Sequence, residues 1–499
     1  MKGFSAILIV VSLVSMPLAA VGAAGMRAAV GSLEFIPLIA VAPDDPQQVA
    51  SSPPPACTSP APVHTYAFYH CYTPDQMAAA YGVDALHAAG ITGKGETIVI
   101  VDSYGSPTAL EDLQFFSSTF GLPAPDLTIL HPTGTPSFNP AMHGIQAGWA
   151  FETSLDVQWA HAIAPDAKLV LVEANPAETQ GVQGFPSMFQ GEAMAIQSYP
   201  GSVISQSFAV TEQSFNGATA TQIARFDDVY AMAAANRVTI VSAAGDSGTA
   251  NVDKQGRLYP FPTAEWPASD PLVTAAGGTW LQYGWKWNPS VSAATYYDCL
   301  NAGTDFDTCA APYLAYMTGA GRTEAVWKED WLPASTGGAL SAVFGTPSWQ
   351  SELSASLLAG MRGLPDLSWN AAVDGAALVY TTFPGARAGW HVVGGTSAST
   401  PQIAGLIALT NQLADQSGKQ HVGWLNPVLY TLPSRDFTDI VPLTFGTGAG
   451  VTTLNSDEEY GSGIPGSSTT TGWDLTTGFG VPSADNFVHD LVAALPSAP

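Results

Sequence analysis

The most informative stretch of this chain reads GGTSASTP at residues 394–401 and runs into an apolar segment, PQIAGLIAL, at residues 401–409. The Gly-Gly-Thr turn is expected to expose the hydroxyl of Ser397, and the segment that follows is typical of a buried helix. Backbone N–H groups at the N-terminus of such a helix stabilise an anion. A serine in this setting indicates a nucleophile, and a serine nucleophile requires a base that takes its proton.

No histidine motif in the chain supplies that base convincingly, but the segment FETSLD at residues 151–156 holds two carboxylates, Glu152 and Asp156. Four residues apart on a helix, they lie on one face. We predict Glu152 as the base, which acts only above its own pKa of about 4, and Asp156 as the group that hydrogen-bonds and orients it. Such a pair is usually a solvated helix face, so the prediction depends on its combination with the serine motif.

A third element is AAGDSG at residues 243–248, where an apolar run ends in a turn bounded by glycines. An Asp in a turn often has only a structural role. If the carboxyl group of Asp246 is protonated, however, it donates a hydrogen bond to a developing oxyanion. We predict this second role because the other two elements accompany it.

These three elements, in this order, resemble the sedolisin family of serine-carboxyl peptidases, which use a Ser-Glu-Asp triad on a subtilisin-like fold. The resemblance covers roughly residues 70–495 and extends to further short motifs: YTP at 72–74, VTAAGGT at 273–279, GGALS at 337–341, PSWQ at 347–350 and RGLPD at 362–366. It implies a secreted acid peptidase with Ser397, Glu152 and Asp156 as its triad. Asp246 then stands where subtilisin-type enzymes have an oxyanion-hole asparagine.

An ordinary subtilisin triad of Asp102, His143 and Ser397 is the alternative on the same fold. Asp102 follows an apolar run, and His143 with its following glycine is similar to the start of the subtilisin histidine helix. However, Ile145 replaces the expected Thr, and Glu152 occupies the place of the histidine in the register that continues to residue 167. We therefore interpret His143 as a loop residue and Asp102 as structural.

The resemblance also implies where substrate and metal bind. A peptide substrate would lie as an added strand between two walls, one formed by Ser205 and Ser207 and the other by Gly337 and Gly338. In the first wall Ala209 replaces the glycine of the family, and its Cβ leaves less room for the close approach of a substrate backbone at that point. One Ca²⁺ ion is implied near the C-terminus, held by carboxylates and backbone carbonyls, the hard oxygen ligands that it prefers, from Asp439, Ile440, Thr470, Gly472 and Asp474.

Strand-length apolar runs alternate with helical segments along the chain. The runs expected to be buried strands lie at residues 97–101, 168–172, 202–204 and 238–243, and a helix is expected at 220–235. This alternation predicts an α/β fold with a doubly wound, mainly parallel sheet, helices on both faces and a site at the carboxyl ends of the strands. Residues 281–331 are interpreted as a long insertion, and residues 444–471, rich in Gly, Ser and Thr, as a loop.

The charge of the chain is strongly acidic, with 15 Lys and Arg against 41 Asp and Glu and a formal net charge of −26 at pH 7. Nucleic-acid binding requires Lys and Arg to neutralise phosphates, so nucleic acid is excluded as a partner. Because only 11% of residues are charged, we expect Ser, Thr, Gln, Asn and Gly to cover much of the surface. The expected partners are polypeptide substrates, and the expected state is a monomer.

The N-terminal residues 1–23 match a secretory signal, with Lys2, an apolar run at 4–18 and small residues at 21–23. Residues 24–64 are predicted to be a Pro-rich linker or short prosegment, much shorter than the folded prodomain of sedolisins, and residues 65–499 the peptidase domain. No other segment is apolar enough to span a membrane. We therefore expect a secreted, extracellular protein.

The four cysteines agree with an exported protein, because their spacing matches no zinc motif and disulfides form outside the cytosol. Three pairings are possible for Cys57, Cys71, Cys299 and Cys309. The local one, which joins the first two and the last two, closes two short loops.

The expected function is an acid endopeptidase, with a tripeptidyl peptidase as a close variant. A non-catalytic exported binding or surface protein on the same fold is the alternative from another class. The reference pKa values of Glu152 and Asp246 both lie near 4, which predicts a working window of roughly pH 3 to 5.

Overall fold

The computed structural model describes residues 8–9, 39–40, 71–139, 143–175, 184–215, 219–253, 255–283, 302, 321–329, 333–373, 375–386, 388–445, 452–459 and 461–499. Cys57, Cys299 and Cys309 lie outside these residues, as do the predicted boundaries after residues 23 and 64. The disulfide pairing and the domain boundaries therefore stay predictions. Within the described part of the chain there is no free cysteine, and Cys71 is buried.

The centre of the molecule is an eight-stranded sheet with the order β12-β11-β9-β7-β4-β6-β5, in which β15 also pairs with β11. Every pairing is parallel except that of β11 with β12. The predicted mainly parallel sheet is confirmed, and its strands are β4 (Thr97–Ser103), β5 (Asp126–Leu130), β6 (Lys168–Ala174), β7 (Val203–Gln206), β9 (Thr239–Ala243), β11 (Thr274–Tyr283), β12 (Arg322–Val326) and β15 (Leu367–Asn370).

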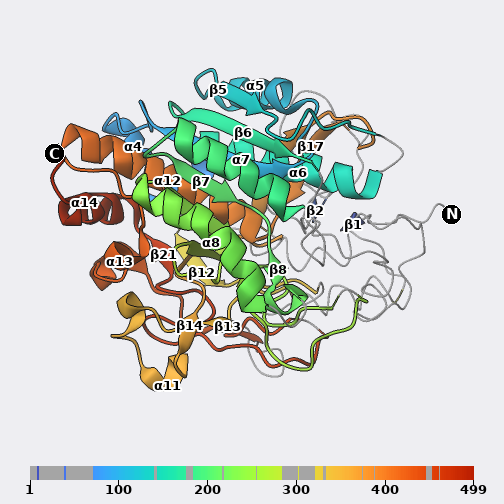
Figure 1. Ribbon diagram of the computed structural model, residues 1–499, viewed down its shortest axis with the longest axis vertical. Helices are drawn as coiled ribbons and strands as arrows, with labels where there is room; N and C mark the ends of the chain where they lie inside the picture. The colour runs from blue at the N-terminus through green and yellow to red at the C-terminus, as the bar shows by residue number, and fades with distance from the viewer. Residues whose placement is uncertain are drawn as a thin grey trace.

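Both faces of this sheet are covered, which explains why its strands are continuous apolar runs. In β4, Val99 and Val101 pack into one core with α7 (Phe185–Ser198) and α8 (Thr219–Ala235). The alternate residues Ile98 and Ile100 pack into the second core, on the side of α6 and α12. Figure 1 shows α7 and α8 in front of the sheet, with α12 behind it. The predicted doubly wound arrangement is therefore confirmed.

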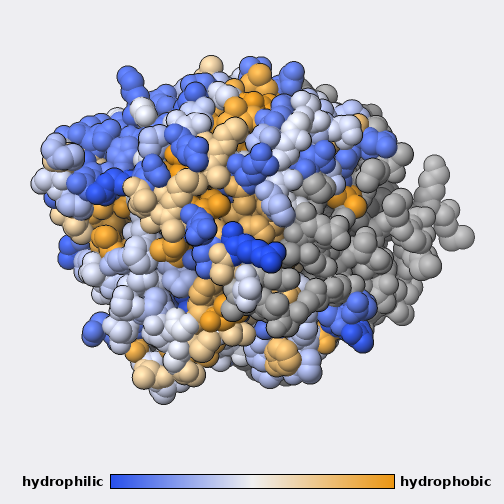
Figure 2. Space-filling view, viewed as in Figure 1, coloured by the Kyte–Doolittle hydropathy of each residue, from blue (hydrophilic) through white to orange (hydrophobic). Residues whose placement is uncertain are grey.

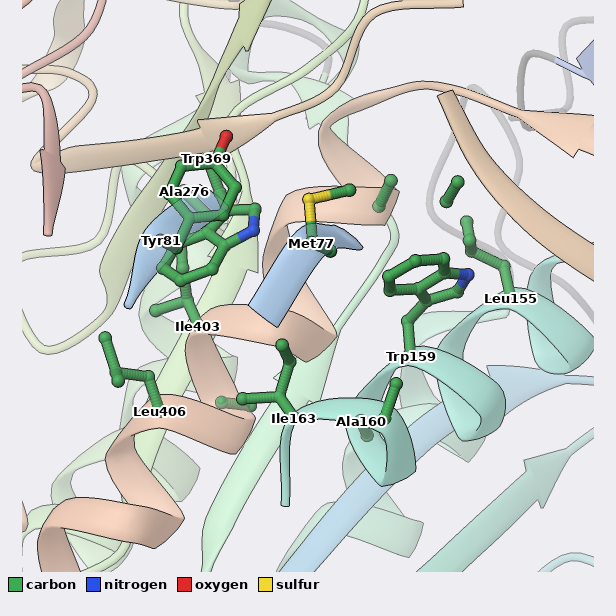
Figure 3. Packing of buried hydrophobic residues seen from close by; sticks show 14 of the residues in the cluster. Met77, Tyr81, Leu155, Trp159, Ala160, Ile163, Ala276, Trp369, Ile403 and Leu406 are labelled. Carbon is green, nitrogen blue, oxygen red and sulfur yellow. The ribbon is translucent and has the colours of Figure 1, made fainter. Parts of the chain in front are cut away.

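The helices α6 (His143–Ile163) and α12 (Thr396–Gln416) pack directly against each other on the same face of the sheet, the rear face in Figure 1. Their contact requires a glycine, because a Cβ on Gly405 would lie 2.8 Å from Cβ of Ile163. Figure 3 shows side chains of α6 and α12 meeting in one apolar cluster, to which Met77 and Tyr81 of α3 (Pro74–Tyr81) also belong. This close packing fixes the two helices that carry the predicted triad.

Smaller elements surround this core. A side sheet has the order β1-β2-β17-β16-β3, and its strands β1 and β2 lie in the segments predicted as signal and linker. The bounds are β1 (Leu8–Ile9), β2 (Ile39–Ala40), β3 (Cys71–Tyr72), β16 (Ala376–Thr381), β17 (Gly389–Val393), β8 (Val210–Thr211), β10 (Glu265–Trp266), β13 (Leu340–Gly345), β14 (Met361–Gly363), β18 (Phe437–Thr438), β21 (Val481–Pro482), α4 (Val83–Ala88), α5 (Ala109–Phe120), α11 (Ala355–Leu358), α13 (Asn426–Leu429) and α14 (Ala484–Ala494).

Two interpretations from the sequence, a loop at 444–471 and a long insertion at 281–331, are wrong in part. The segment 444–471 includes most of an antiparallel hairpin, formed by β19 (Leu443–Phe445) and β20 (Thr452–Leu454). The predicted insertion 281–331 starts within β11 and has β12 near its end, so its two flanks belong to the central sheet. In both segments the Gly, Ser or Asn content masked short strands, because short pairings need few apolar residues.

The surface agrees with the low charge density of the chain. Much of the face in Figure 2 is white or pale blue, the colours of residues near the middle of the hydropathy scale such as Ser, Thr and Gly. Among the described residues only Phe261 and Val441 are exposed large hydrophobic side chains. No helix in the described ranges has both the length and the apolarity needed to cross a membrane.

Candidate active site

The two predicted carboxylates lie one turn apart in the middle of α6, and neither is a solvated surface group. Glu152 and Asp156 are both fully buried, with 0% of each residue exposed. Ser397 is also fully buried, so the expectation that the turn exposes its hydroxyl is wrong. It is the second residue of α12, which begins at Thr396, earlier than the predicted helical segment at 401–409. At this position the Ser397 N–H belongs to the first four amides of the helix, which have no intrahelical acceptor.

The turn before Ser397 depends on its two glycines. Gly395 has φ 114°, in the region that side chains disfavour. A Cβ on Gly394 would lie 2.8 Å from the carbonyl oxygen of Ala371 and from the amide of Val373. The Gly-Gly pair therefore lets the chain pass close to β15 and turn sharply into α12.

Asp156 is held by a residue that was expected to have another role. The Ser207 hydroxyl, just after β7, donates a hydrogen bond to Asp156 Oδ1 at 3.0 Å, while Asp156 Oδ2 has no partner among the described residues. The side chain of Ser207 therefore points toward the carboxylates, rather than toward a bound peptide. Ser205 lies within β7, which is paired on both sides, and it is fully buried.

The electrostatics connect Glu152 with the nucleophile. Burial raises the pKa of Glu152 well above its usual range, and Asp102 and Asp246 raise it further, whereas the hydroxyls of Ser397 and Ser207 lower it. Within the described structure neither Glu152 oxygen nor the Ser397 hydroxyl makes a hydrogen bond. Catalytic hydrogen bonds are often long in the absence of substrate, so adjacency without a bond is compatible with a base and its nucleophile.

Asp102 is part of the same cluster, although the sequence was interpreted as giving it only a structural role. It lies near the carboxyl end of β4 and is fully buried. Burial raises the pKa of Asp102 to about 7, against a lowering effect of the Thr153 hydroxyl. Its charge also raises the pKa of both Glu152 and Asp156. Ionisation of one of these three carboxyl groups opposes ionisation of the others, so their titrations belong to the cluster rather than to each residue.

His143 is the first residue of α6, so the prediction that it lies in a loop is wrong. It precedes Glu152 by nine residues in the same helix, which separates the two by about 13 Å along the helix axis. Glu152 is the group whose pKa the Ser397 hydroxyl lowers. This arrangement favours Glu152 over His143 as the base.

Asp246 lies three residues after the end of β9, beside the start of α12. Its Oδ1 accepts hydrogen bonds from the N–H of Thr396 at 2.7 Å and from the Thr396 hydroxyl at 2.8 Å. Its Oδ2 has no partner among the described residues and lies 2.7 Å from where a Cβ on Gly395 would stand. Burial raises the pKa of Asp246, and the two bonds from Thr396 lower it. A protonated Oδ2 is therefore free to donate beside Ser397.

Sequence reasoning missed two neighbours of Asp246. Thr396 stood in the motif, but its adjacency to Asp246 follows only from the fold. Glu265, in β10, is buried against the same turn, with its carboxyl carbon 2.6 Å from where a Cβ on Gly245 would lie. Burial raises the pKa of Glu265 to about 8, and the charge of Asp246 contributes in the same direction.

Gly337 and Gly338 lie next to this turn. The Gly337 N–H donates to the carbonyl oxygen of Gly245 at 2.7 Å, and a Cβ on Gly337 would lie 2.0 Å from the carbonyl oxygen of Ala244. A Cβ on Gly338 would lie 2.0 Å from the carbonyl oxygen of Leu475. The two glycines thus bring three backbone segments together beside Asp246.

The predicted calcium ligands converge on one turn near the C-terminus. Asp439 Oδ2 accepts a hydrogen bond from the Gly472 N–H at 2.9 Å, and Asp474 Oδ2 accepts one from the Thr470 N–H at 2.8 Å. Asp474 Oδ1 accepts the N–H groups of Thr476 and Thr477, both at 2.9 Å. Two carboxylates and the carbonyl groups of this turn are hard oxygen donors, which fits Ca²⁺ in chemical type.

No protein-family model matches the chain. Kumamolisin from Bacillus sp. (strain MN-32) is 31% identical over 441 residues, which are 86% of this chain and 64% of kumamolisin. Sedolisin from Pseudomonas sp. (strain 101) is 26% identical over 420 residues, 82% of this chain and 59% of sedolisin. Tripeptidyl-peptidase 1 from Macaca fascicularis is 30% identical over 350 residues, 68% of this chain and 52% of that protein. The chain thus spans less than two thirds of the length of each of these relatives.

A solved structure of Pseudomonas sedolisin, a serine-carboxyl proteinase complexed with two molecules of pseudo-iodotyrostatin, superposes on this fold with a TM-score of 0.62. The match covers 85% of this chain and 99% of that one, at 24% sequence identity. The likeness shows a shared subtilisin-like architecture.

Proposed function

This chain belongs to the sedolisin family, and we propose that it is an exported serine-carboxyl peptidase that hydrolyses peptide bonds at acidic pH. The observation that carries the proposal is the convergence, at the carboxyl ends of the central strands, of a helix-terminal serine with a buried carboxylate pair. An unpartnered carboxyl oxygen of Asp246 lies beside the same serine. A binding scaffold gains nothing from burying these groups together, because each buried carboxyl group costs free energy.

In the proposed mechanism, Ser397 Oγ attacks the carbonyl carbon of the scissile peptide bond while its proton passes to Glu152. Asp156, held by the Ser207 hydroxyl, orients Glu152 through a hydrogen bond that forms when substrate is bound. The negative charge that develops on the carbonyl oxygen accepts hydrogen bonds from protonated Asp246 Oδ2 and from the Ser397 N–H. Glu152 then returns the proton to the leaving amine, and water hydrolyses the acyl-enzyme with Glu152 again as base.

Ser207 acts in this scheme through Asp156 and is therefore a positioning residue. We propose the backbone around residues 207–209 and 336–338 as the two walls that hold a peptide as an added strand, with Gly337 and Gly338 fixing the second wall. Tripeptidyl-peptidase 1 is a relative, so tripeptidyl-peptidase activity is the alternative to endopeptidase activity on this fold. We assign the chain to the endopeptidases, and the lengths of products from a denatured protein distinguish the two.

The deciding experiment is incubation of the purified, folded protein with a denatured protein substrate across acidic and neutral pH. Turnover at acidic pH that disappears in Ser397→Ala supports the peptidase. Absence of turnover at every pH, with the fold confirmed by circular dichroism, would instead support a non-catalytic exported binding protein.

We further propose export and a bound calcium ion. Residues 1–23 would act as a secretory signal, residues 24–64 as a linker or short prosegment and residues 65–499 as a monomeric extracellular peptidase domain with disulfides between Cys57 and Cys71 and between Cys299 and Cys309. One Ca²⁺ ion would be held by the carboxylates of Asp439 and Asp474 and the carbonyl oxygens of Ile440, Thr470 and Gly472.

Removal of this calcium is expected to lower the melting temperature by roughly 3–5 °C, because an ion that binds only the folded state stabilises it by mass action. The measurement is thermal unfolding of the Ser397→Ala protein, which avoids self-digestion, before and after chelation. Asp439→Asn is the matched control and should unfold at the same temperature with or without chelator. An unchanged melting temperature of the parent protein, once shown to be metal-free, would contradict the site.

Stability is expected to fall as pH rises from about 4 to about 8, because buried acids hold their protons in the folded state. Burial raises the pKa of Glu192, Glu265 and Asp270 each to about 8. Each of these acids has a pKa that is higher in the folded than in the unfolded state. Its contribution to the free energy of unfolding is therefore fully present below about pH 4 and is lost as pH rises through the folded-state pKa. Each group contributes on the order of a few kcal/mol.

Denaturant unfolding of Ser397→Ala from pH 4 to pH 8 tests this dependence. Glu192→Gln keeps the hydrogen bond that Glu192 Oε1 accepts from Gln206 and removes one titrating proton, so its stability should depend less steeply on pH. A free energy of unfolding that stays constant or rises toward pH 8 would be inconsistent with these buried acids.

A further inference from the structure

A cluster of metal-ligating side chains lies at the end of the sheet opposite the triad. Glu96, Asp415 and His421 present one ligand atom each, and these atoms all lie within 4.8 Å of one another. Glu96 immediately precedes β4, whose other end carries Asp102, about 20 Å away along the strand. Asp415 is near the end of α12, about 27 Å along the helix axis from Ser397. The cluster is therefore separate from the catalytic groups, and it shares no residue with the proposed calcium site.

The orientation of His421 is fixed in the way that metal-binding histidines are fixed. Its Nδ1 lies 2.9 Å from the carbonyl oxygen of Gly201, and because a carbonyl only accepts, Nδ1 carries the hydrogen. The ring packs closely on that glycine, since a Cβ on Gly201 would lie 2.7 Å from Nδ1. The neutral ring then presents the lone pair of Nε2 to the other two residues, an arrangement in which a backbone carbonyl selects the tautomer of a ligand.

The two carboxylates face this lone pair. His421 Nε2 lies 3.1 Å from Asp415 Oδ1 and 3.8 Å from Glu96 Oε2. The side chain of Glu96 is only 4% exposed and accepts no hydrogen bond from any described residue. Its buried carboxylate, an acceptor, therefore faces the lone pair of His421 Nε2, which is also an acceptor. A proton on Nε2 would satisfy Asp415 but would leave Glu96 without a hydrogen bond at 3.8 Å. A cation between the three would contact all of them.

We propose that Glu96, Asp415 and His421 bind a divalent transition-metal ion of the Zn²⁺ class. One imidazole nitrogen with two carboxylate oxygens is a donor set for such ions rather than for Ca²⁺, which takes oxygen ligands only. With bonds of about 2.0–2.2 Å, tetrahedral coordination requires ligand atoms about 3.3–3.6 Å apart. The Asp415 side chain is 62% exposed and is free to make the small movement required. Its exposure also provides an entry path and leaves the fourth position to water.

The metal would join the last turn of α12 to the segment that enters β4. Because α12 carries Ser397 at its other end, the ion would stabilise the helix that positions the nucleophile without touching the reacting atoms. It would bind the folded state only, since Glu96 is distant in sequence from Asp415 and His421, and its contribution would add to stability by mass action.

The test uses the full chain as Ser397→Ala, stripped with chelator and returned to pH 7 with excess Ca²⁺ so that oxygen-only sites are filled. Zinc bound after gel filtration is counted, and Co²⁺ is added separately to record the visible spectrum of the coordinated ion. The site variant is Asp415→Asn with His421→Gln. Its control is Asp485→Asn with His489→Gln, which removes a similar exposed Asp–His pair on α14 whose atoms lie 3.5 Å apart.

We expect the parent and the control to bind one equivalent of Zn²⁺ more than the site variant, and to show a Co²⁺ spectrum and a zinc-dependent rise in melting temperature that the site variant lacks. Asp415→Asn alone changes an exposed residue and gives a second, milder variant, expected to bind zinc at least tenfold more weakly. Equal zinc binding by parent and site variant would overturn the proposal. So would a parent that binds no zinc, which would show that a protonated His421 pairs with the carboxylates instead. Failure of peptidase activity does not affect this test, because every protein in it is catalytically inactive by design.

Discussion

Ser397→Ala and Glu152→Gln are each expected to lower kcat/KM by about 10⁴- to 10⁶-fold, the loss typical of removing a nucleophile or its base from a serine peptidase. Removal of Ser397 Oγ eliminates the attacking atom. Gln at position 152 has the size of the carboxylate but cannot accept the proton. Both side chains are fully buried, yet both changes conserve shape closely, so the fold should remain intact.

The double variant should be little worse than either single one, because residues that act as one catalytic unit have non-additive effects. Initial rates on a denatured protein and on a chromogenic peptide provide the measurement. Glu192→Gln is the matched control: it is also a fully buried glutamate, its Oε1 bonds Gln206 rather than any triad member, and it should keep near-normal turnover. Near-normal turnover of Glu152→Gln together with inactivity of His143→Ala would restore the subtilisin triad.

The sequence predicted the fold well because burial on both faces leaves a direct trace in composition. The apolar runs at 97–101 and 168–172 became β4 and β6, and the doubly covered sheet followed from them. The catalytic candidates were found for a similar reason. The spacing of Glu152 and Asp156 is a local helical pattern. Ser397 and Asp246 each lie in a glycine-containing turn next to an apolar segment, which is also visible in the local sequence.

What the sequence did not predict depends on contacts between distant segments. The bond from Ser207 to Asp156 joins residues 51 positions apart, and the bond from Thr396 to Asp246 joins residues 150 apart. Asp102 was interpreted as structural because Glu152 takes the place of the subtilisin histidine, but its own segment does not show that it lies buried beside Glu152. The hairpin at 443–454 was missed because its strands are only three residues long, too short to produce a strand-length apolar run.

These contacts change the expected pH behaviour in a definite direction. Reference pKa values near 4 gave a window of roughly pH 3 to 5 for a base and an acid in water. In the folded protein burial raises the pKa of Glu152 well above its usual range and also raises that of Asp246. Both limits of the window therefore move upward, and we expect the optimum in the upper part of that range or above it, with activity falling toward neutral pH.

The acid limb should belong to Glu152 and its cluster, since the base must lose a proton, and the alkaline limb to Asp246, which must keep one to donate. Activity then depends on a form with Glu152 ionised and Asp246 neutral. The pH optimum lies midway between the two apparent pKa values, and this holds whether the base or the acid has the higher one. Raising both pKa values therefore shifts the pH profile upward and keeps its bell shape.

Asp246→Asn should remove the alkaline limb and leave the acid limb in place. The Asn side chain can keep Oδ1 as the acceptor of both hydrogen bonds from Thr396, and its NH₂ group then replaces Oδ2, the atom without a partner that lies beside Gly395. An amide donates at every pH, so the residual kcat/KM should stay level through neutral pH, where the wild-type value falls about tenfold per pH unit. Profiles of kcat/KM from pH 3 to pH 8 for the two proteins provide the comparison. An Asp246→Asn profile with the same alkaline limb would show that a protonated Asp246 does not control that limb, and a wild-type optimum at about pH 7 or above would contradict the proposed activity at acidic pH.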